Sequence, residues 1–398
     1  MPLDRTKTFL DRMLKGRASA AAIDHGGTLL ISADDARGKV DTIPTHPASE
    51  RSIDDTRPLS ASEICSAIDR SFPFWEHGAR LEVLGKIMST IGQYYRENGQ
   101  AFLDGFPIVE RHGLHLLVSN FYSPIANIDE VLRRSTAPLI DDDFGVDLDI
   151  AGQLVSFDRM VVPWLAELAD IPMHDPGKAG AFFWLNGMFG PQDAATYYGL
   201  MRSCRPNHVI EIGSGYSTLI ATMVRTHNAT MQVTSIEPYP VEFFSRHLRS
   251  ENGFHLIEKI VQDVDRGIFE TLEANDILFI DSSHVVKPGS DVEFLIYSLL
   301  GRLKKGVIIH FHDIFLPFGY PMDFYQSQHR HWNENYVLAA YLAHNSRFEV
   351  ILANAFLANR SDSPVLDRLC SGIVPDDAAK RATLRMNCGG GSLWLRKC

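Results

Sequence analysis

The chain has 398 residues, of which 45% are hydrophobic and 22% are charged, a composition typical of folded globular proteins. Its formal net charge of -11 argues against a nucleic acid partner, because phosphate binding depends on clusters of Lys and Arg. The chain has no apolar leader segment and no run of about 18 apolar residues, so the sequence predicts neither a secretory signal nor a membrane span. Five scattered cysteines without a CxxC pair are typical of reduced thiols, and we expect a cytoplasmic protein.

The N-terminal half carries little that points to chemistry. Residues 1–60 are polar and are expected to form a poorly packed lead-in. Residues 61–179 are expected to form an accessory region that helps to shape a substrate pocket. Within it, apolar residues at three- and four-residue spacings predict amphipathic helices over 61–104, and a further helix is predicted over 157–169.

From residue 180 the pattern changes to short apolar runs that alternate with helical segments. The runs, each predicted as a strand, are 208–212, 232–237, 255–261, 276–281, 306–311, 348–353 and 392–397. The helices predicted between them are 192–203, 217–228, 240–250, 265–273, 290–303 and 332–344. This alternation predicts an α/β fold over 180–398, a doubly wound, seven-stranded, Rossmann-like sheet preceded by a mostly helical or irregular N-terminal region.

The first predicted strand runs into a glycine turn with the sequence VIEIGSGYST, residues 209–218. Gly213 and Gly215 permit tight backbone geometry and the close approach of a ligand, and Ser217 or Thr218 can cap the helix that follows. An acidic residue, Glu237, ends the next strand about 20 residues later, where such folds hold a ribose diol. The third strand ends near Asp263, where a polar group can meet an adenine amine.

The ordered set EIGSGYS, SIEP, VQDV and LFIDSSH resembles the motifs of class I S-adenosylmethionine-dependent methyltransferases over about residues 180–398. The resemblance implies that Glu211 supports the glycine loop, Glu237 binds the ribose hydroxyls and Asp263 binds the adenine. The implied cofactor-binding residues are Glu211, Gly213, Ser214, Gly215, Tyr216, Ser217, Glu237, Asp263 and Asp281. The sequence departs from the family pattern here, because Tyr216 follows Gly215 and the third glycine of the pattern is absent.

Two other interpretations of the glycine turn remain open. A dinucleotide oxidoreductase is less favoured, because GSGYST lacks the last glycine of the GxGxxG pattern that places a pyrophosphate on a helix N-terminus. The turn can also be purely structural, in an α/β protein that binds no nucleotide.

Polar clusters follow the fourth and fifth predicted strands. Asp281-Ser282-Ser283-His284 follows one strand, and the other ends in His310-Phe311-His312-Asp313. Because the carboxyl ends of parallel strands face one crevice, we expect both clusters beside the glycine turn. A histidine there suits a general base near neutral pH, and a divalent cation can lower the pKa of a bound hydroxyl.

This layout is similar to metal-dependent O-methyltransferases of the catechol and macrolide-sugar types. The resemblance implies Asp281, His312 and Asp313 as metal ligands and His284 as the base, so that His284, Asp281 and His312 are the candidate catalytic residues. A histidine at 312 departs from the acid or amide of those families, and it favours manganese, iron or zinc over magnesium.

Each of these residues also has a plainer interpretation. Asp281 can contact only the cofactor, His284 can cap its loop, His312 can be a satisfied strand-end residue, and His310 is expected to be packed in the core. The apolar loop 314–321 can shape an acceptor pocket or form a contact in a homo-oligomer.

The leading hypothesis is a biosynthetic S-adenosylmethionine-dependent O-methyltransferase acting on a small-molecule acceptor, a sugar, phenol or secondary metabolite. The alternatives are a metal-independent N- or carboxyl-methyltransferase, a catalytically silent cofactor-binding scaffold and, more remotely, a hydroxylase.

Overall fold

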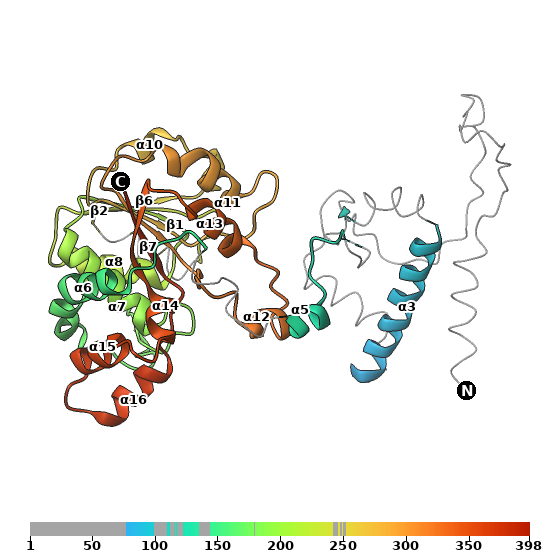
Figure 1. The fold of residues 1–398 in the computed structure, drawn as a ribbon, viewed down its shortest axis with the longest axis horizontal. Helices are drawn as coiled ribbons and strands as arrows, with labels where there is room; N and C mark the ends of the chain where they lie inside the picture. Colours follow the sequence, from blue (N-terminus) through green and yellow to red (C-terminus); the bar gives the residue numbers. More distant parts are fainter. Residues whose placement is uncertain are drawn as a thin grey trace, which may run out of the picture. The chain divides into compact units, whose positions relative to one another are not determined.

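A computed structural model describes residues 77–98, 110, 111, 115, 117, 122–134, 144–178, 180–241, 246, 249 and 252–398 (Figure 1). The chain divides into two compact units, Met1–Leu116 and Leu117–Cys398. In the first unit the described part includes the helix α3 (His77–Glu97), which lies within the region where amphipathic helices are predicted. The predicted lead-in over 1–60 lies outside the described residues.

The second unit is built on one seven-stranded sheet. Its strands are β1 (His208–Ile212), β2 (Gln232–Ile236), β3 (Phe254–Ile257), β4 (Ile277–Ile280), β5 (Ile308–Phe311), β6 (Phe348–Ala353) and β7 (Leu393–Lys397). The strand order is β3-β2-β1-β4-β5-β7-β6. Strands β1 to β5 pair in parallel, whereas β7 pairs antiparallel with both β5 and β6. The predicted fold class is confirmed.

Most residues of the central strands are apolar because both faces of the sheet are buried. Along β4, Ile277 and Phe279 belong to one hydrophobic core, and Leu278 and Ile280 belong to the other. Successive side chains of a strand point to opposite faces, so a strand covered on both faces reads as a continuous apolar run.

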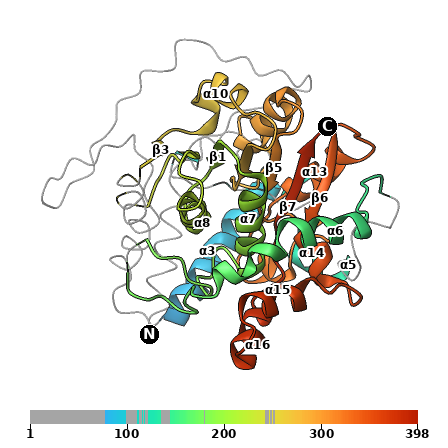
Figure 2. The ribbon, with the colours of Figure 1, turned by 90° about the vertical axis from the view of Figure 1, so that its left-hand side faces the viewer.

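Helices cover the two faces (Figures 1 and 2). On the first face lie α6 (Ile150–Met160), the 3-10 helix η1 (Val162–Leu168), α7 (Pro191–Cys204), α8 (Tyr216–Arg225) and α15 (Val365–Ile373). On the second lie α10 (Gly267–Glu270), the helical segment of α11 (Asp291–Glu293), η3 (Phe294–Leu299) and η4 (Leu300–Arg302), and α13 (Glu334–Leu342). The remaining elements are α5 (Ile128–Arg134), η2 (Val261–Asp263), α12 (Met322–Gln326), α14 (Asn354–Asn359) and α16 (Ala378–Met386).

The sheet domain draws on residues that precede position 180. Phe157 in α6 and Leu165 in η1 are buried in the same core as the sheet. The backbone N–H of Ala353, at the end of β6, donates to the side chain of Gln153 at 2.8 Å. The proposed division at 179 stays a prediction, but residues 150–168 share the core of the sheet.

The ends of several helices differ from the predicted ranges. The helix predicted over 157–169 is split into α6 and η1, with Pro163 at the start of η1. The segment predicted over 290–303 is α11, a π-helical turn and a 3-10 turn in succession. Most of the helix predicted over 240–250 lies outside the described residues.

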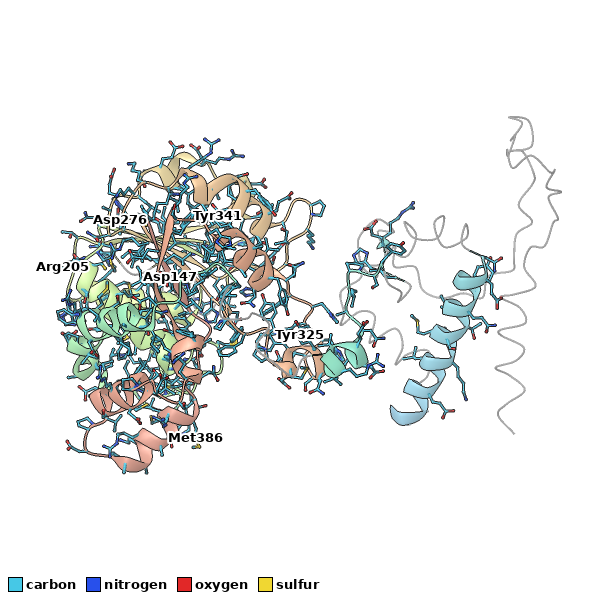
Figure 3. The ribbon with its side chains drawn as sticks, viewed as in Figure 1. Asp147, Arg205, Asp276, Tyr325, Tyr341 and Met386 are labelled. Carbon is cyan, nitrogen blue, oxygen red and sulfur yellow. The ribbon has the colours of Figure 1, made fainter. Side chains whose placement is uncertain are left out.

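Asp276, which is labelled in Figure 3, lies just before β4 and joins the starts of two strands by hydrogen bonds. Its Oδ1 accepts from the backbone N–H groups of Asn207 and His208, and its Oδ2 accepts from that of Glu273. These hydrogen bonds hold the amino ends of β1 and β4 together. Within the described part of the chain, no helix combines the length and the apolar character that crossing a membrane requires.

Candidate active site

The glycine turn closes the carboxyl edge where β1, β2 and β4 meet. The backbone N–H of Gly213 donates to the carbonyl of Ile236, and that of Asp281 donates to the carbonyl of Ile212. Gly213 has φ +98°, and a Cβ on it would lie 2.7 Å from the carbonyl oxygen of Asp281. Only glycine fits this backbone and this close approach. Gly215 is extended, and a Cβ there would meet nothing within 4 Å, so the turn borders open space.

The buried side chain of Glu211 supports the glycine turn through hydrogen bonds. Its two carboxylate oxygens accept hydrogen bonds from the hydroxyl groups of Ser217, Thr218 and Ser235, at 2.5, 2.5 and 3.0 Å. Thr218 also accepts from the backbone N–H of Gly215 and thereby caps α8, whereas the Ser217 hydroxyl is committed to Glu211. Burial raises the pKa of Glu211 to about 7 although the three hydroxyl groups act in the opposite direction.

The other predicted cofactor residues lie along the same edge. Glu237 follows β2, and its side chain accepts from the backbone N–H of Tyr239. Asp263 ends η2 and is exposed. Tyr216 and Ser214 are half-buried, and the Tyr216 ring packs edge-on against that of Phe183 at 5.5 Å. Their binding roles stay predictions.

Four charged side chains converge next to the turn, as expected for the ends of β4 and β5. Nε2 of His284 lies 3.3 Å from Oδ1 of Asp281 and 3.8 Å from Oδ2 of Asp313. Nδ1 of His312 lies 3.7 Å from each of the same two oxygens. His284 and Asp313 both have a left-handed backbone, with φ of 59° and 54°. Such conformations in non-glycine residues are costly and gather at functional sites.

His284 is held by a buried carboxylate that the sequence analysis did not assign. Its Nδ1 lies 2.9 Å from Oε2 of Glu334, the first residue of α13, whose side chain is 1% exposed. The backbone N–H groups of Asn333 and Glu334 donate to the carbonyl of His284, and the Trp332 ring lies 4.2 Å from the imidazole. The imidazole is therefore held by the Glu334 carboxylate and the Trp332 ring, and the backbone that carries it is bonded to the start of α13.

His312 has an equivalent partner in Asp193 of α7. Its Nε2 lies 3.7 Å from Oδ2 of Asp193, a carboxylate that also accepts from the side chain of Asn354 and from the backbone N–H groups of Gly391 and Ser392. Each site histidine thus has one nitrogen toward a buried carboxylate and the other toward Asp281 and Asp313.

His310 lies one layer deeper. It is fully buried, its Nε2 is 2.8 Å from the Ser392 hydroxyl, and its ring stacks on Phe279 at 3.8 Å. This placement agrees with a packed core histidine rather than a catalytic one.

The charges of the cluster set its protonation. Burial favours a neutral His284, but the hydrogen bonds and charges of Asp281 and Glu334 outweigh it and raise its pKa to about 9. In the same way, Asp281, Asp193 and Asp313 raise the pKa of His312 against the effect of burial. The two imidazoles in turn hold the pKa of Asp281 below its usual range despite burial. The histidines and carboxylates of this cluster therefore stabilise one another's charged forms against the effect of burial.

The predicted metal site is not supported. Carboxylate and imidazole groups are suitable metal donors. Within the described ranges, however, no group of three or more His, Cys, Asp or Glu side chains is arranged to hold a metal ion. The assignment of Asp281, His312 and Asp313 as ligands remains a prediction.

The part of the chain that contains these site residues matches a known protein family. Residues 210–314 match a family model described as a methyltransferase domain. The matched segment includes the glycine turn, Asp281, His284, His312 and Asp313, on the mixed seven-stranded sheet described above. Residues 210–314 are therefore identified as a methyltransferase domain.

This methyltransferase is similar to an uncharacterized protein of Archaeoglobus fulgidus, with 36% identity over 165 residues that cover 40% of this chain and 74% of the relative. Among solved structures it is similar to the plantazolicin methyltransferase BamL in complex with a triazolic desmethylPZN analog and SAH, with 13% identity and a TM-score of 0.34 over 63% of this chain and 99% of that chain. A putative methyltransferase from Thermobifida fusca shows 13% identity and a TM-score of 0.32 over 64% and 96% of the two chains. Both TM-scores are below 0.5, so the fold is assigned from the strand order of the sheet and not from these two structures.

The two carboxylates behind the histidines lie outside the matched segment. Asp193 precedes it and Glu334 follows it, so each is far in sequence from the histidine that it contacts. The one sequence signal was an acidic residue near the start of a predicted helix, which ordinarily indicates a favourable helix-dipole contact.

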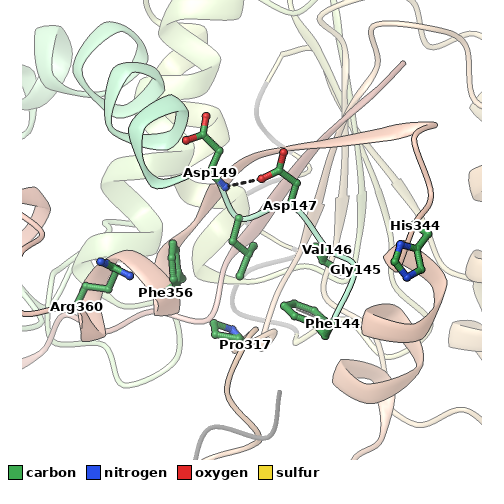
Figure 4. Close-up of a pocket in the computed structure, with 10 residues that line it drawn as sticks. Phe144, Gly145, Val146, Asp147, Asp149, Pro317, His344, Phe356 and Arg360 are labelled. Carbon is green, nitrogen blue, oxygen red and sulfur yellow. Dashed lines mark hydrogen bonds between the residues drawn. The ribbon is translucent and has the colours of Figure 1, made fainter. Parts of the chain in front are cut away.

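A cavity of about 540 Å³ lies elsewhere on the methyltransferase domain (Figure 4). It is lined by Phe144, Gly145, Val146, Asp147, Leu148, Asp149, Pro317, His344, Phe356 and Arg360. The Asp147 carboxylate in its wall accepts from the backbone N–H of Asp149. None of the predicted site residues lines this cavity.

Proposed function

We propose that this methyltransferase uses S-adenosylmethionine to methylate a hydroxyl group of a small molecule, with His284 as the general base. One observation carries the proposal. His284 is oriented through Nδ1 by the buried Glu334, so that Nε2 is directed to the carboxyl edge of the sheet beside the glycine turn. An imidazole fixed in this way can take a proton from a reacting group held near it.

The turn itself fits the cofactor. Gly215 borders open space, and the tight packing of Gly213 on Asp281 brings the turn and the charged cluster together. Glu237 and Asp263 stand after the next two strands, where the resemblance implies ribose and adenine contacts. S-adenosylmethionine would supply a methyl group on a sulfonium, which makes the transfer an in-line displacement by the acceptor oxygen.

The contribution of the chain is to hold the acceptor hydroxyl and to remove its proton. Nε2 of His284 accepts this proton when the imidazole is neutral, and Glu334 stabilises the imidazolium that results. Asp281 lies between both histidines and acts as a charge that orients them. His312 is held by Asp193 on the other side of the same pair of carboxylates.

In this scheme the proton of the acceptor hydroxyl moves to His284, and no metal ion takes part in the proton transfer. The metal-dependent form, with Asp281, His312 and Asp313 as ligands, differs from it in one measurable way. Transfer by His284 alone persists in a chelator, whereas transfer that needs a cation at these residues is lost.

A variant that keeps the unusual backbone of residue 284 tests the base. Asn tolerates a left-handed φ better than most residues, so His284→Asn removes the imidazole with little strain. Methyl transfer from labelled S-adenosylmethionine to a panel of phenols and sugars is expected to fall by about a hundredfold to ten-thousandfold. Affinity for S-adenosylhomocysteine should stay within about twofold of the wild type, given that imidazole loss leaves the turn intact. Undiminished transfer in His284→Asn would remove His284 from the proposed role.

A further inference from the structure

We propose that the methyl acceptor carries a carboxylate or phosphate group and that Arg330 binds this group while the reacting hydroxyl lies at His284. This inference rests on the proposed function and extends it to the chemical class of the acceptor. It starts from a cation that lies against two aromatic rings next to the site and that forms no ion pair within the described residues.

Two aromatic rings fix the Arg330 guanidinium. Its Cζ lies 4.9 Å from the centre of the Phe324 ring and 4.5 Å from that of Trp332, and these two rings pack edge-to-face at 5.3 Å. The backbone N–H of Arg330 donates to the carbonyl of Phe324, which ties the segment back to α12. The two rings restrict the position of the guanidinium by cation–π contacts and leave its N–H donors to other partners.

Those donors have no protein acceptor within the described ranges. No ion pair or side-chain hydrogen bond of Arg330 occurs there, in contrast to Arg360, which is bonded through two nitrogens to Asp362. The carboxylate of Asp323 is engaged by Gln328, and the pKa of Asp323 is lowered by its hydrogen bonds to Ser327 and Gln328 more than by Arg330. A fork of N–H donors is the group best suited to bind a carboxylate or phosphate through two hydrogen bonds.

The same ring connects Arg330 to the proposed base. The Trp332 ring lies 4.5 Å from Cζ of Arg330 and 4.2 Å from the His284 imidazole. The guanidinium and the imidazole thus share one neighbouring ring, and the inference requires an acceptor long enough to reach past it.

Two histidines flank Arg330 in the sequence. Burial and His329 lower the pKa of His331. Its Nδ1 is buried and has no hydrogen-bond partner among the described residues, so it can offer a ligand a neutral polar contact. The acidic residues nearest the base, Asp281 and Glu334, are already paired with His284. Asp313 likewise lies beside His284 and His312, and no ion pair between these carboxylates and Arg330 occurs among the described residues.

Calorimetric titration of the full chain, with and without S-adenosylhomocysteine, tests the inference. The probes are protocatechuate and phenyl phosphate, each compared with its neutral parent, catechol and phenol. We expect at least one acid to bind the wild type about tenfold more tightly than its parent, and Arg330→Gln to abolish this preference. Whether the carboxylate or the phosphate is the preferred probe identifies the anion.

Two further variants make the result specific. Arg330→Lys keeps the charge but not the fork, and it should retain only part of the preference. Arg360→Gln removes another arginine that lies over a ring, that of Phe356, but that is paired with Asp362, and it should leave the preference unchanged.

The inference is overturned if neither acid is preferred by the wild type, or if the preference survives Arg330→Gln. Loss of the preference in Arg360→Gln instead would also overturn it. If S-adenosylhomocysteine binds neither the wild type nor any variant, the proposed function fails. The titrations of the acids without S-adenosylhomocysteine still decide whether Arg330 binds an anion.

Discussion

Oε2 of Glu334 lies 2.9 Å from Nδ1 of His284, and both side chains are almost fully buried. The two residues are 50 positions apart in the chain, at the first turn of α13 and in the loop after β4. The contact leaves Nε2 as the nitrogen of His284 that faces Asp281 and Asp313. A carboxylate in this position fixes the tautomer and the orientation of an imidazole and stabilises its protonated form.

Replacing Glu334 with Gln should lower kcat for methyl transfer by roughly tenfold to a hundredfold. The amide keeps the shape of the side chain but not the charge that supports the imidazolium. KM for the acceptor and the affinity for S-adenosylhomocysteine should change little, since neither ligand is expected to contact Glu334. Asp291→Asn is the matched control, because Asp291 binds Ser283 in the same loop without contacting His284. A role for Glu334 in folding alone would instead lower the melting temperature and leave kcat per folded molecule unchanged.

The rate of methyl transfer should rise with pH and level off above about pH 9. Asp281 and Glu334 raise the pKa of His284 to about 9 against the effect of burial, and only the neutral imidazole can accept a proton. The measurement is kcat across the alkaline range with S-adenosylmethionine at saturation. In Glu334→Gln the rising limb should move to lower pH, because one of the two groups that raise the pKa of His284 is gone. A profile without an alkaline limb in the wild type would contradict a role for His284 as a free base.

The two glycines of the turn should respond differently to substitution with Ala. Gly213→Ala should destabilise the fold by about 1–3 kcal/mol, because φ is +98° and the new Cβ would lie 2.7 Å from the Asp281 carbonyl oxygen. Gly215→Ala should fold with nearly wild-type stability, since its backbone is extended and nothing lies within 4 Å of the new Cβ. It should nevertheless weaken binding of S-adenosylhomocysteine, because the methyl group would enter the space proposed for the cofactor. Thermal unfolding and calorimetric titration of both variants separate these effects, and unchanged affinity in Gly215→Ala would move the cofactor away from this turn.

The ion pair between α7 and η1 should make stability depend on acid pH. Arg202, together with Tyr198, lowers the pKa of Glu167 from 4.5 to about 2. The ionised Glu167 therefore stabilises the folded state above about pH 4.5, and this stabilisation is lost as the pH falls toward 2. Glu167→Gln should cost about 1 kcal/mol of unfolding free energy at neutral pH and progressively less in acid, as measured by urea denaturation. The control is Glu273→Gln, which breaks an exposed pair with Lys304 and should have no measurable effect.

The sequence alone predicted the strands of the sheet and the candidate active site at the carboxyl edge of that sheet. The ranges 208–212 and 348–353 are the observed bounds of β1 and β6. Buried parallel strands are short apolar runs, and the polar residues that end them mark the carboxyl edge. Asp281, His284, His312 and Asp313 were brought together by that rule alone.

The partners of the histidines could not be predicted from local patterns. Glu334 and Asp193 each meet their histidine only through the packing of a helix against the sheet edge, and their spacing in the sequence carries no periodicity. The helices α14, α15 and α16, between β6 and β7, were also not predicted. The same holds for the π-helical turn over 294–299, because its apolar residues fit an ordinary helical pattern equally well.

The central claim is that S-adenosylmethionine binds at the glycine turn. Calorimetric titration of the full chain with S-adenosylhomocysteine, with and without a chelator, tests it most directly. The account predicts micromolar binding of similar strength in both conditions. Absence of binding in both would contradict the claim and leave the turn between β1 and α8 as a site for some other ligand or for none.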